Sequence, residues 1–240
     1  FDVDVAEYLA RVGYVGLAID LYGNTVPPAQ RLFPTEESKV KSFMTATFEA
    51  MVGLDHDYEK FRALLQEWLD QGLAHPSVDS SIPGAAIGYC FGGVAVIEAV
   101  RAGLNLGGVV SFHGLLQTGE DPSPARMGVD RLPIKDCENN YNTNTTIFIE
   151  NGAEDHLVPS ESRRRFFDEM DNAGVDWCFN DHAKTPHGFA LPPTLGGPGK
   201  LHKSTDRRST MHRKSLYREI FPNVPQNPVT HNGAGTSIPV

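Results

Sequence analysis

A cysteine stands in the middle of a glycine-rich hexapeptide, Gly88-Tyr89-Cys90-Phe91-Gly92-Gly93. The G-x-C-x-G spacing is that of a nucleophile elbow, a sharp strand-to-helix turn that exposes its central side chain, with cysteine in the usual place of serine. We expect the turn to require glycine at positions 88 and 92, because the Cβ atom of any other residue would collide with neighbouring atoms there. The Phe91 N–H would donate to an oxyanion, and the helix N-terminus would favour the thiolate of Cys90. The alternative is a buried cysteine in a tightly packed turn.

Two further side chains complete a possible catalytic triad. Asp155 lies in the polar segment 151–159, after one predicted strand, and His187 follows the next strand in Thr185-Pro186-His187-Gly188-Phe189. The chain order nucleophile, acid, histidine is that of α/β-hydrolases. Asp155 would orient His187 and stabilise its imidazolium form. Two alternatives stay open, that Asp155 caps the following helix and that Glu154 is the acid.

Other residues with chemical potential carry weaker signals. Cys178 lies in the middle of a predicted strand and is expected to be a core thiol, while Cys137 stands in a long polar segment. His113 follows a strand and is expected to have a structural role. Asp55-His56-Asp57 lacks further ligands at suitable spacing, so we expect no metal site. The sequence has no G-x-G-x-x-G motif and no P-loop, and we expect no cofactor.

The elements that would position the triad alternate between helices and strands. This alternation predicts an α/β fold, with a mostly parallel, doubly wound sheet and helices on both faces. The segment 116–144 is longer than a usual connection and would be either a lid or a surface insertion. Strands are expected at 14–19, 85–88, 108–112, 146–150 and 175–180, and helices at the N-terminus and at 36–51, 57–71, 91–102, 160–172 and 204–220.

Composition narrows the class of protein. The 240 residues have a formal net charge of −9, which disfavours binding to nucleic acid or to anionic lipid. No apolar run approaches the roughly 20 residues of a membrane-spanning helix, and we expect no membrane association. Three cysteines without a C-x-x-C pair fit a reducing compartment, so the expected location is the cytoplasm. We expect one domain over residues 1–222 and an irregular Pro/Asn/Gly-rich tail over 223–240.

The motifs together resemble the dienelactone hydrolase family, in the branch that uses a cysteine nucleophile. The resemblance implies an α/β-hydrolase fold and a triad of Cys90, Asp155 and His187, and it favours Asp155 over Glu154. It also implies a small-molecule ester or lactone as substrate. Besides the elbow, the similar segments are 13–23 with its ending Asp20-Leu21-Tyr22-Gly23, Ser111-Phe112-His113-Gly114, Gly152-Ala153-Glu154-Asp155, His187-Gly188-Phe189-Ala190 and Asp206-Arg207-Arg208-Ser209.

The chain departs from the family pattern in two places. Family members have strands and a loop before the first helix found here, and these supply a second oxyanion-hole N–H and a glutamate near the thiol. We therefore expect the domain to be N-terminally incomplete. Leu191 stands where well-known members have an arginine that binds a substrate carboxylate. This difference weakens dienelactone as the substrate, and substrate-binding residues stay unassigned.

The sequence thus predicts a hydrolase that cleaves an ester, lactone or thioester through Cys90, His187 and Asp155, by way of an acyl-thioester intermediate. Amides rank low as substrates, because an amine leaves less readily than the thiolate that has just attacked. The alternative function is a non-catalytic structural or interaction protein that keeps the fold. In that case the tail over 223–240 would bind a protein partner.

Overall fold

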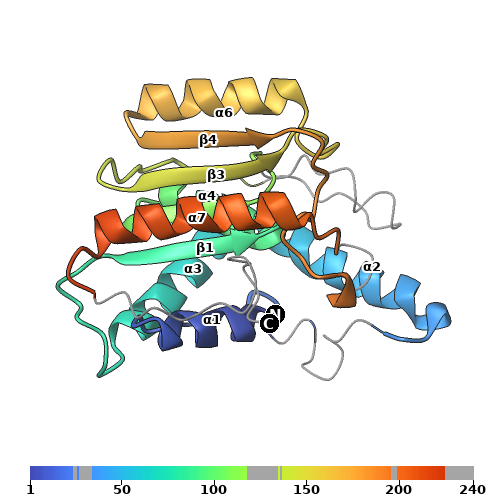
Figure 1. Cartoon of the computed structure of the whole chain (residues 1–240), viewed down its shortest axis with the longest axis horizontal. Helices are drawn as coiled ribbons and strands as arrows, with labels where there is room; N and C mark the ends of the chain where they lie inside the picture. Colours follow the sequence, from blue (N-terminus) through green and yellow to red (C-terminus); the bar gives the residue numbers. More distant parts are fainter. Residues whose placement is uncertain (24–25, 27–33, 118–134, 136, 196–198, 225–240) are drawn as a thin grey trace.

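The structure is a computed structural model of the chain, and it describes residues 1–23, 26, 34–117, 135, 137–195 and 199–224. From β1 onward the strands and helices follow the order that the sequence predicts, with no described helix between β2 and β3 (Figure 1). The predicted tail lies outside the described residues from 225 onward, as do positions 118–134 and 136 of the long polar segment. The elements are α1 (Asp2–Arg11), α2 (Glu37–Asp55), α3 (Tyr58–Leu73), β1 (Gly84–Tyr89), α4 (Phe91–Arg101), β2 (Leu106–Phe112), β3 (Thr146–Gly152), α6 (Ser160–Ala173), β4 (Asp176–His182), the short 3-10 helix η2 (Pro193–Leu195) and α7 (Lys203–Ile220).

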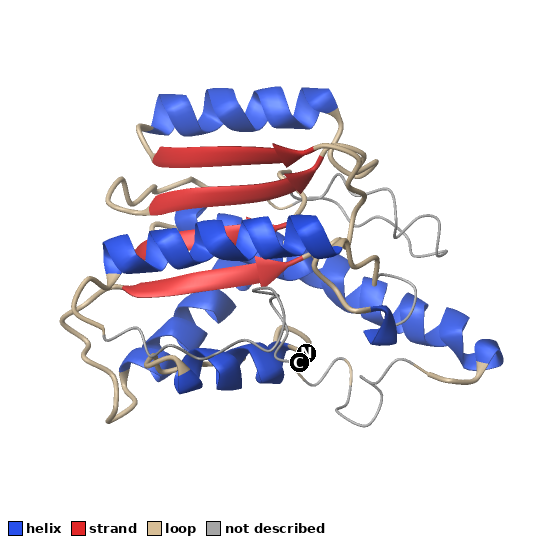
Figure 2. Cartoon of the chain, in the orientation of Figure 1, coloured by secondary structure: helices blue, strands red, loops and turns tan. Residues whose placement is uncertain are grey.

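The four described strands form one parallel sheet in the order β1-β2-β3-β4. Helices cover both faces, with α7 in front of the sheet and α4 behind it in the view of Figures 1 and 2. The predicted α/β fold with a parallel, doubly wound sheet is confirmed. Because all four strands run the same way, their carboxyl ends meet at one edge of the sheet. The loops that carry the candidate triad all leave from that edge.

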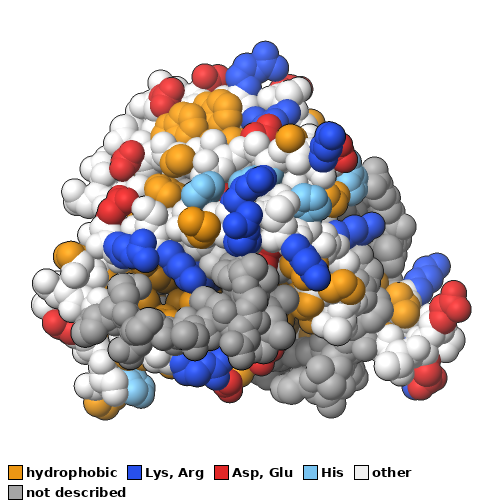
Figure 3. All heavy atoms as spheres, in the orientation of Figure 1, with side chains coloured by type: hydrophobic (Ala, Val, Ile, Leu, Met, Phe, Trp, Pro, Cys, Tyr) orange, Lys and Arg blue, Asp and Glu red, His pale blue; other side chains and the backbone are white. Residues whose placement is uncertain are grey.

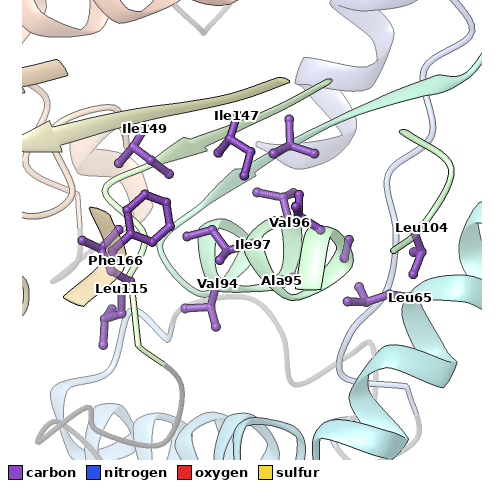
Figure 4. Close-up of a cluster of buried hydrophobic side chains, with 14 of the residues drawn as sticks. Leu65, Val94, Ala95, Val96, Ile97, Leu104, Leu115, Ile147, Ile149 and Phe166 are labelled. Atoms are coloured by element: carbon purple, nitrogen blue, oxygen red, sulfur yellow. The ribbon is translucent and has the colours of Figure 1, made fainter. Parts of the chain in front are cut away.

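Alternating side chains on the strands divide the core into two clusters. Ile147 and Ile149 of β3 point toward Val96 and Ile97 of α4 (Figure 4). Phe148, which lies between the two isoleucines in the sequence, packs in the cluster on the other face, below α7. Both faces of the sheet are therefore buried, which explains why its strands appear in the sequence as almost continuous apolar runs.

A buried charge network holds α4 between its neighbours. Glu98 is 1% exposed, and its two carboxylate oxygens accept hydrogen bonds from Arg62 of α3 and Arg101 of α4. Arg101 in turn forms a bidentate pair with Glu169 of α6, with N···O distances of 2.7 and 2.8 Å. These pairs bring α3 and α6 against the helix that begins at Phe91. Each charge of this network is paired, as burial requires.

The expected strand at 14–19 is wrong. Residues 15–20 have no regular secondary structure, and the described sheet begins with β1. The segment instead runs against α1, where a Cβ on Gly16 would lie 2.2 Å from the carbonyl oxygen of Ala6. Val15 and Leu17 are 50% and 49% exposed. An apolar run makes a segment able to join a sheet, but pairing requires a neighbouring strand.

The described helices differ from membrane-spanning helices, which contain about 20 predominantly apolar residues. None of them combines the length and the apolar character that a membrane-spanning helix needs.

Candidate active site

Cys90 occupies a strained turn between β1 and α4. Its backbone angles are φ 55° and ψ −115°, in a region that non-glycine residues rarely adopt. The Cys90 N–H lies 3.0 Å from the carbonyl oxygen of Phe112 and 3.2 Å from Nδ1 of His113, so the end of β2 holds the turn in place. Phe91 is the first residue of α4 and its N–H has no acceptor within the helix. This N–H is therefore available to an anion at the head of the turn.

Two glycines make this turn possible, but only one of them is among the two we expected. A Cβ on Gly88 would lie 1.8 Å from the carbonyl oxygen of Gly92, so no larger residue fits there without moving the backbone. Gly92 itself has open space, and the expectation that its own Cβ would collide is wrong. The second close approach is at Gly93, where a Cβ would lie 2.6 Å from the Cα of Gly114. Gly93 thus lets α4 pack against the loop after β2.

The structure brings Cys90, His187 and Asp155 together at the carboxyl edge of the sheet. Nε2 of His187 lies 3.3 Å from Sγ of Cys90, and Nδ1 of His187 lies 2.8 Å from Oδ2 of Asp155. The other oxygen of Asp155 accepts the N–H of Leu157 at 2.9 Å. The Asp155 side chain is fully buried, whereas Glu154 is exposed. The geometry therefore favours Asp155 over Glu154 as the partner of His187.

Backbone hydrogen bonds join the two loops that carry the acid and the histidine. The N–H of Ala153 donates to the carbonyl of His182 at 2.9 Å, and the N–H of Glu154 donates to the carbonyl of Thr185 at 3.0 Å. The loop after β3 and the loop after β4 thus continue the contact of their strands beyond the sheet. This fixes the spacing between Asp155 and His187 through the backbone.

His187 has a strongly perturbed pKa. Burial favours the neutral imidazole, but the hydrogen bonds to Asp155 and Cys90 and their negative charges outweigh it and raise the pKa of His187 to about 10. At neutral pH the ring therefore carries a proton between a carboxylate and a sulfur atom. An imidazolium in this position stabilises a thiolate and can deliver a proton to a leaving group.

His113 has a closer relation to the site than its sequence suggests. It is fully buried with φ 41°, its N–H donates to the carbonyl of Glu150, and its ring lies edge-on to that of His187 at 5.1 Å between centroids. Burial and the positive charge of His187 hold the pKa of His113 well below its usual range. A neutral ring can accept the Cys90 N–H through Nδ1. The expected structural role of His113 thus includes support of the turn that holds Cys90. The only sequence signal for this role is the position of His113 directly after a strand.

The remaining candidates lie outside this constellation. Asp57 caps α3 by accepting the N–H of Lys60 and pairs with Lys135, which accounts for its place in the Asp-His-Asp run. Cys178 is half-buried on β4, 4.0 Å from Oδ1 of Asn180, and Cys137 is half-buried elsewhere.

A cavity of about 220 Å³ lies between the loop after β2 and the start of α6, with Leu116 and His156 in its lining. Cys90, Asp155 and His187 do not line this cavity.

Comparisons with known proteins identify the family and the fold of the chain. Residues 2–214 match the sequence model of the dienelactone hydrolase family. A dienelactone hydrolase-like promiscuous phosphotriesterase from metagenomic libraries is 29% identical with a TM-score of 0.53, and the match covers 67% of this chain and 61% of that one. A protein named m3DLH is 27% identical with a TM-score of 0.56, over 78% of this chain and 69% of the other.

A third structure, a putative dienelactone hydrolase from Klebsiella pneumoniae, has a TM-score of 0.57 over 90% of this chain and 80% of its own, at 13% identity. This likeness concerns the fold alone. A search of curated proteins found no match. The chain spans about three fifths of the length of the phosphotriesterase. The family match covers most of the present chain, from residue 2 to residue 214. The chain belongs to the dienelactone hydrolase family.

Proposed function

We propose that the protein hydrolyses an ester, a lactone or a thioester, with Cys90 as nucleophile, His187 as acid and base, and Asp155 as the group that orients His187. One observation carries the proposal. An unbroken set of contacts runs from the buried Asp155 carboxylate to His187 and on to the sulfur of Cys90, at the head of a strained turn. Strain of this kind persists where the surrounding structure holds it, and it clusters at functional sites.

In the first half of the reaction, the thiolate of Cys90 attacks the substrate carbonyl carbon and forms a C–S bond. The π electrons move to the carbonyl oxygen, and the Phe91 N–H donates to this oxyanion. As the oxyanion collapses, the bond to the leaving alcohol or thiol breaks. His187 gives its proton to that leaving group, and an acyl-thioester remains on Cys90.

In the second half, neutral His187 takes a proton from a water molecule whose oxygen attacks the acyl-thioester. The C–S bond then breaks, the acid product leaves, and the thiolate of Cys90 returns beside a protonated His187. Asp155 keeps Nδ1 of the ring bonded throughout, so that Nε2 faces the reacting atoms. Ester, lactone and thioester substrates suit this cycle because His187 can protonate the departing alkoxide or thiolate, and both of these leave more readily than the anion of an amine.

The same chemistry bears on the cellular location. The described cysteines, including the proposed nucleophile, are all free thiols. A thiolate nucleophile is preserved in a reducing compartment. We therefore propose the cytoplasm as the place where the enzyme acts.

Selective alkylation tests the reactivity of the site. In the folded protein, iodoacetamide should modify Cys90 well before Cys137 and Cys178 at pH 7. The expectation follows from the contact between Nε2 of His187 and Sγ of Cys90, because His187 keeps its proton until the pH rises through about 10. Burial raises the pKa of Cys178, which slows its reaction at neutral pH. The rates are read from the masses of the labelled peptides.

His187→Ala supplies the comparison within the same fold. Without the imidazolium, alkylation of Cys90 should slow at least about tenfold at pH 7 and should then climb steadily with pH. Equal rates at the three cysteines of the folded wild-type protein would count against the proposed function, as would a Cys90 rate unaffected by His187→Ala.

A further inference from the structure

A second cluster of polar side chains lies under α7, away from Cys90. Glu150 of β3 faces His182 at the end of β4, with 2.7 Å between Oε2 and Nε2. Its other oxygen, Oε1, lies 2.9 Å from Nδ1 of His212 on α7 and accepts the Nδ2–H of Asn180 at 2.8 Å. Glu150 is fully buried, the His182 side chain is 9% exposed, and that of His212 is 39% exposed. Three separate elements thus direct ligand-type atoms at one point that solvent can reach beside His212.

The charges within the cluster call for a cation. A buried carboxylate is costly unless a positive charge compensates it. Asn180 offers only an amide dipole. One protonated histidine would neutralise Glu150, yet two histidines contact this carboxylate, one at each oxygen. The second histidine is superfluous for a simple ion pair, but a metal ion needs both.

We propose that Glu150, His182 and His212 form a site for a divalent transition metal of the zinc class. Two imidazole nitrogens and one carboxylate are a donor set that zinc uses in proteins. The three ligand atoms all lie within 4.8 Å of one another, so modest side-chain rotations would bring them to coordination distance. The site departs from our expectation that the chain holds no metal. Sequence spacing could not reveal it, because its ligands stand 32 and 30 residues apart on different elements.

The surroundings of the cluster are compatible with a cation despite the basic character of α7. Lysine and arginine side chains stand among histidines on the surface that α7 presents (Figure 3). His212 nevertheless faces the carboxylate of Glu150, with 2.9 Å between its Nδ1 and Oε1 of Glu150. Asp181, between Asn180 and His182, pairs with Arg163 and Asn151 rather than with the cluster. An ion bound between the two histidines would therefore lie beside the negative charge of Glu150.

Bound metal would join β3, β4 and α7 at one point. His182 ends β4 and its ring lies 5.9 Å from that of Phe189, two residues after His187. The metal would therefore stabilise the segment that presents the catalytic histidine, without taking part in the proposed chemistry. The proposal does not rest on the hydrolase function, and either one can fail alone.

Metal binding to the full chain tests the proposal. Protein freed of metal with a chelator is titrated with Zn²⁺ and, separately, with Co²⁺, and bound metal is counted after dialysis. We expect one equivalent per chain, a Co²⁺ absorption spectrum of nitrogen and oxygen ligands, and a higher Tm with Zn²⁺. His212→Ala changes a half-exposed side chain and should keep the fold, yet weaken binding at least about 100-fold, more than loss of a supporting residue around a metal costs.

Three further variants make the result specific. Glu150→Gln keeps the size of the buried side chain and should also lose the metal, while His75→Ala, at an exposed histidine in a loop, should bind as the wild type does. Cys90→Ala should retain the metal, because a thiol and an imidazole in the triad are themselves possible zinc ligands. Binding that survives His212→Ala, binding lost in Cys90→Ala, or no stoichiometric binding to the wild type would each overturn the proposal.

Discussion

Cys90→Ala and His187→Ala should each lower kcat on an activated ester by about 10³-fold or more, and the double variant should be little worse than either. The expectation follows from the contact between Nε2 of His187 and Sγ of Cys90, because the two groups act in the same step. Without the sulfur there is no nucleophile for the imidazole to serve. Steady-state hydrolysis by the four proteins gives the double-mutant cycle.

Two more variants complete the series. Asp155→Asn should cost less than either change, since the amide keeps the size of the side chain and part of the hydrogen bonding around His187. Cys178→Ala, which removes a half-buried thiol on β4, should keep wild-type kcat and serves as the matched control. Losses from Cys90→Ala and His187→Ala that simply multiply in the double variant would show that the two residues do not act together.

Gly88→Ala should strongly destabilise the protein, whereas Gly92→Ala should not. A Cβ at position 88 would lie 1.8 Å from the Gly92 carbonyl oxygen, a backbone atom that cannot rotate away. The strand and the start of α4 would have to separate, and we expect a loss of about 3 kcal/mol in the free energy of unfolding. At Gly92 a methyl group meets open space within a helix, so the free energy of unfolding should stay unchanged or rise by up to about 1 kcal/mol.

Urea denaturation of the two variants and the wild type measures this difference. Both substitutions replace a glycine by alanine in the same motif, so the comparison isolates the space around each Cβ. Equal midpoints for Gly88→Ala and Gly92→Ala would contradict the geometry of the turn.

The sequence was sufficient for the order of most elements. Apolar periodicity located the helices from 36 onward and all four strands of the described sheet, because these segments are buried on one or both faces. The same signal failed at residues 14–19, which form no strand. Local composition records what a segment is able to bury, but it does not say whether a partner strand is present.

The candidate triad could be predicted from the sequence for a different reason. A strained strand-to-helix turn needs glycines at fixed spacing, and parallel strands place the loops of Asp155 and His187 at one edge of the sheet. Neither rule reaches the pairing of Glu98 with Arg62, or the meeting of Glu150, His182 and His212. These contacts depend on how α3, α4 and α7 pack on the sheet, which is set by the whole core. The error at Gly92 has the same origin, since only the packed turn shows which Cβ would collide.

The most direct test of the proposed mechanism is to trap the acyl group on the protein. A reaction with an activated ester is quenched in acid within the first turnovers, and the digested protein is examined by mass spectrometry. We expect the mass of the acyl group on the peptide that contains Cys90, and no such adduct in Cys90→Ala. Hydrolysis that persists in Cys90→Ala, or an acyl group found on a different residue of the wild-type protein, would contradict the account.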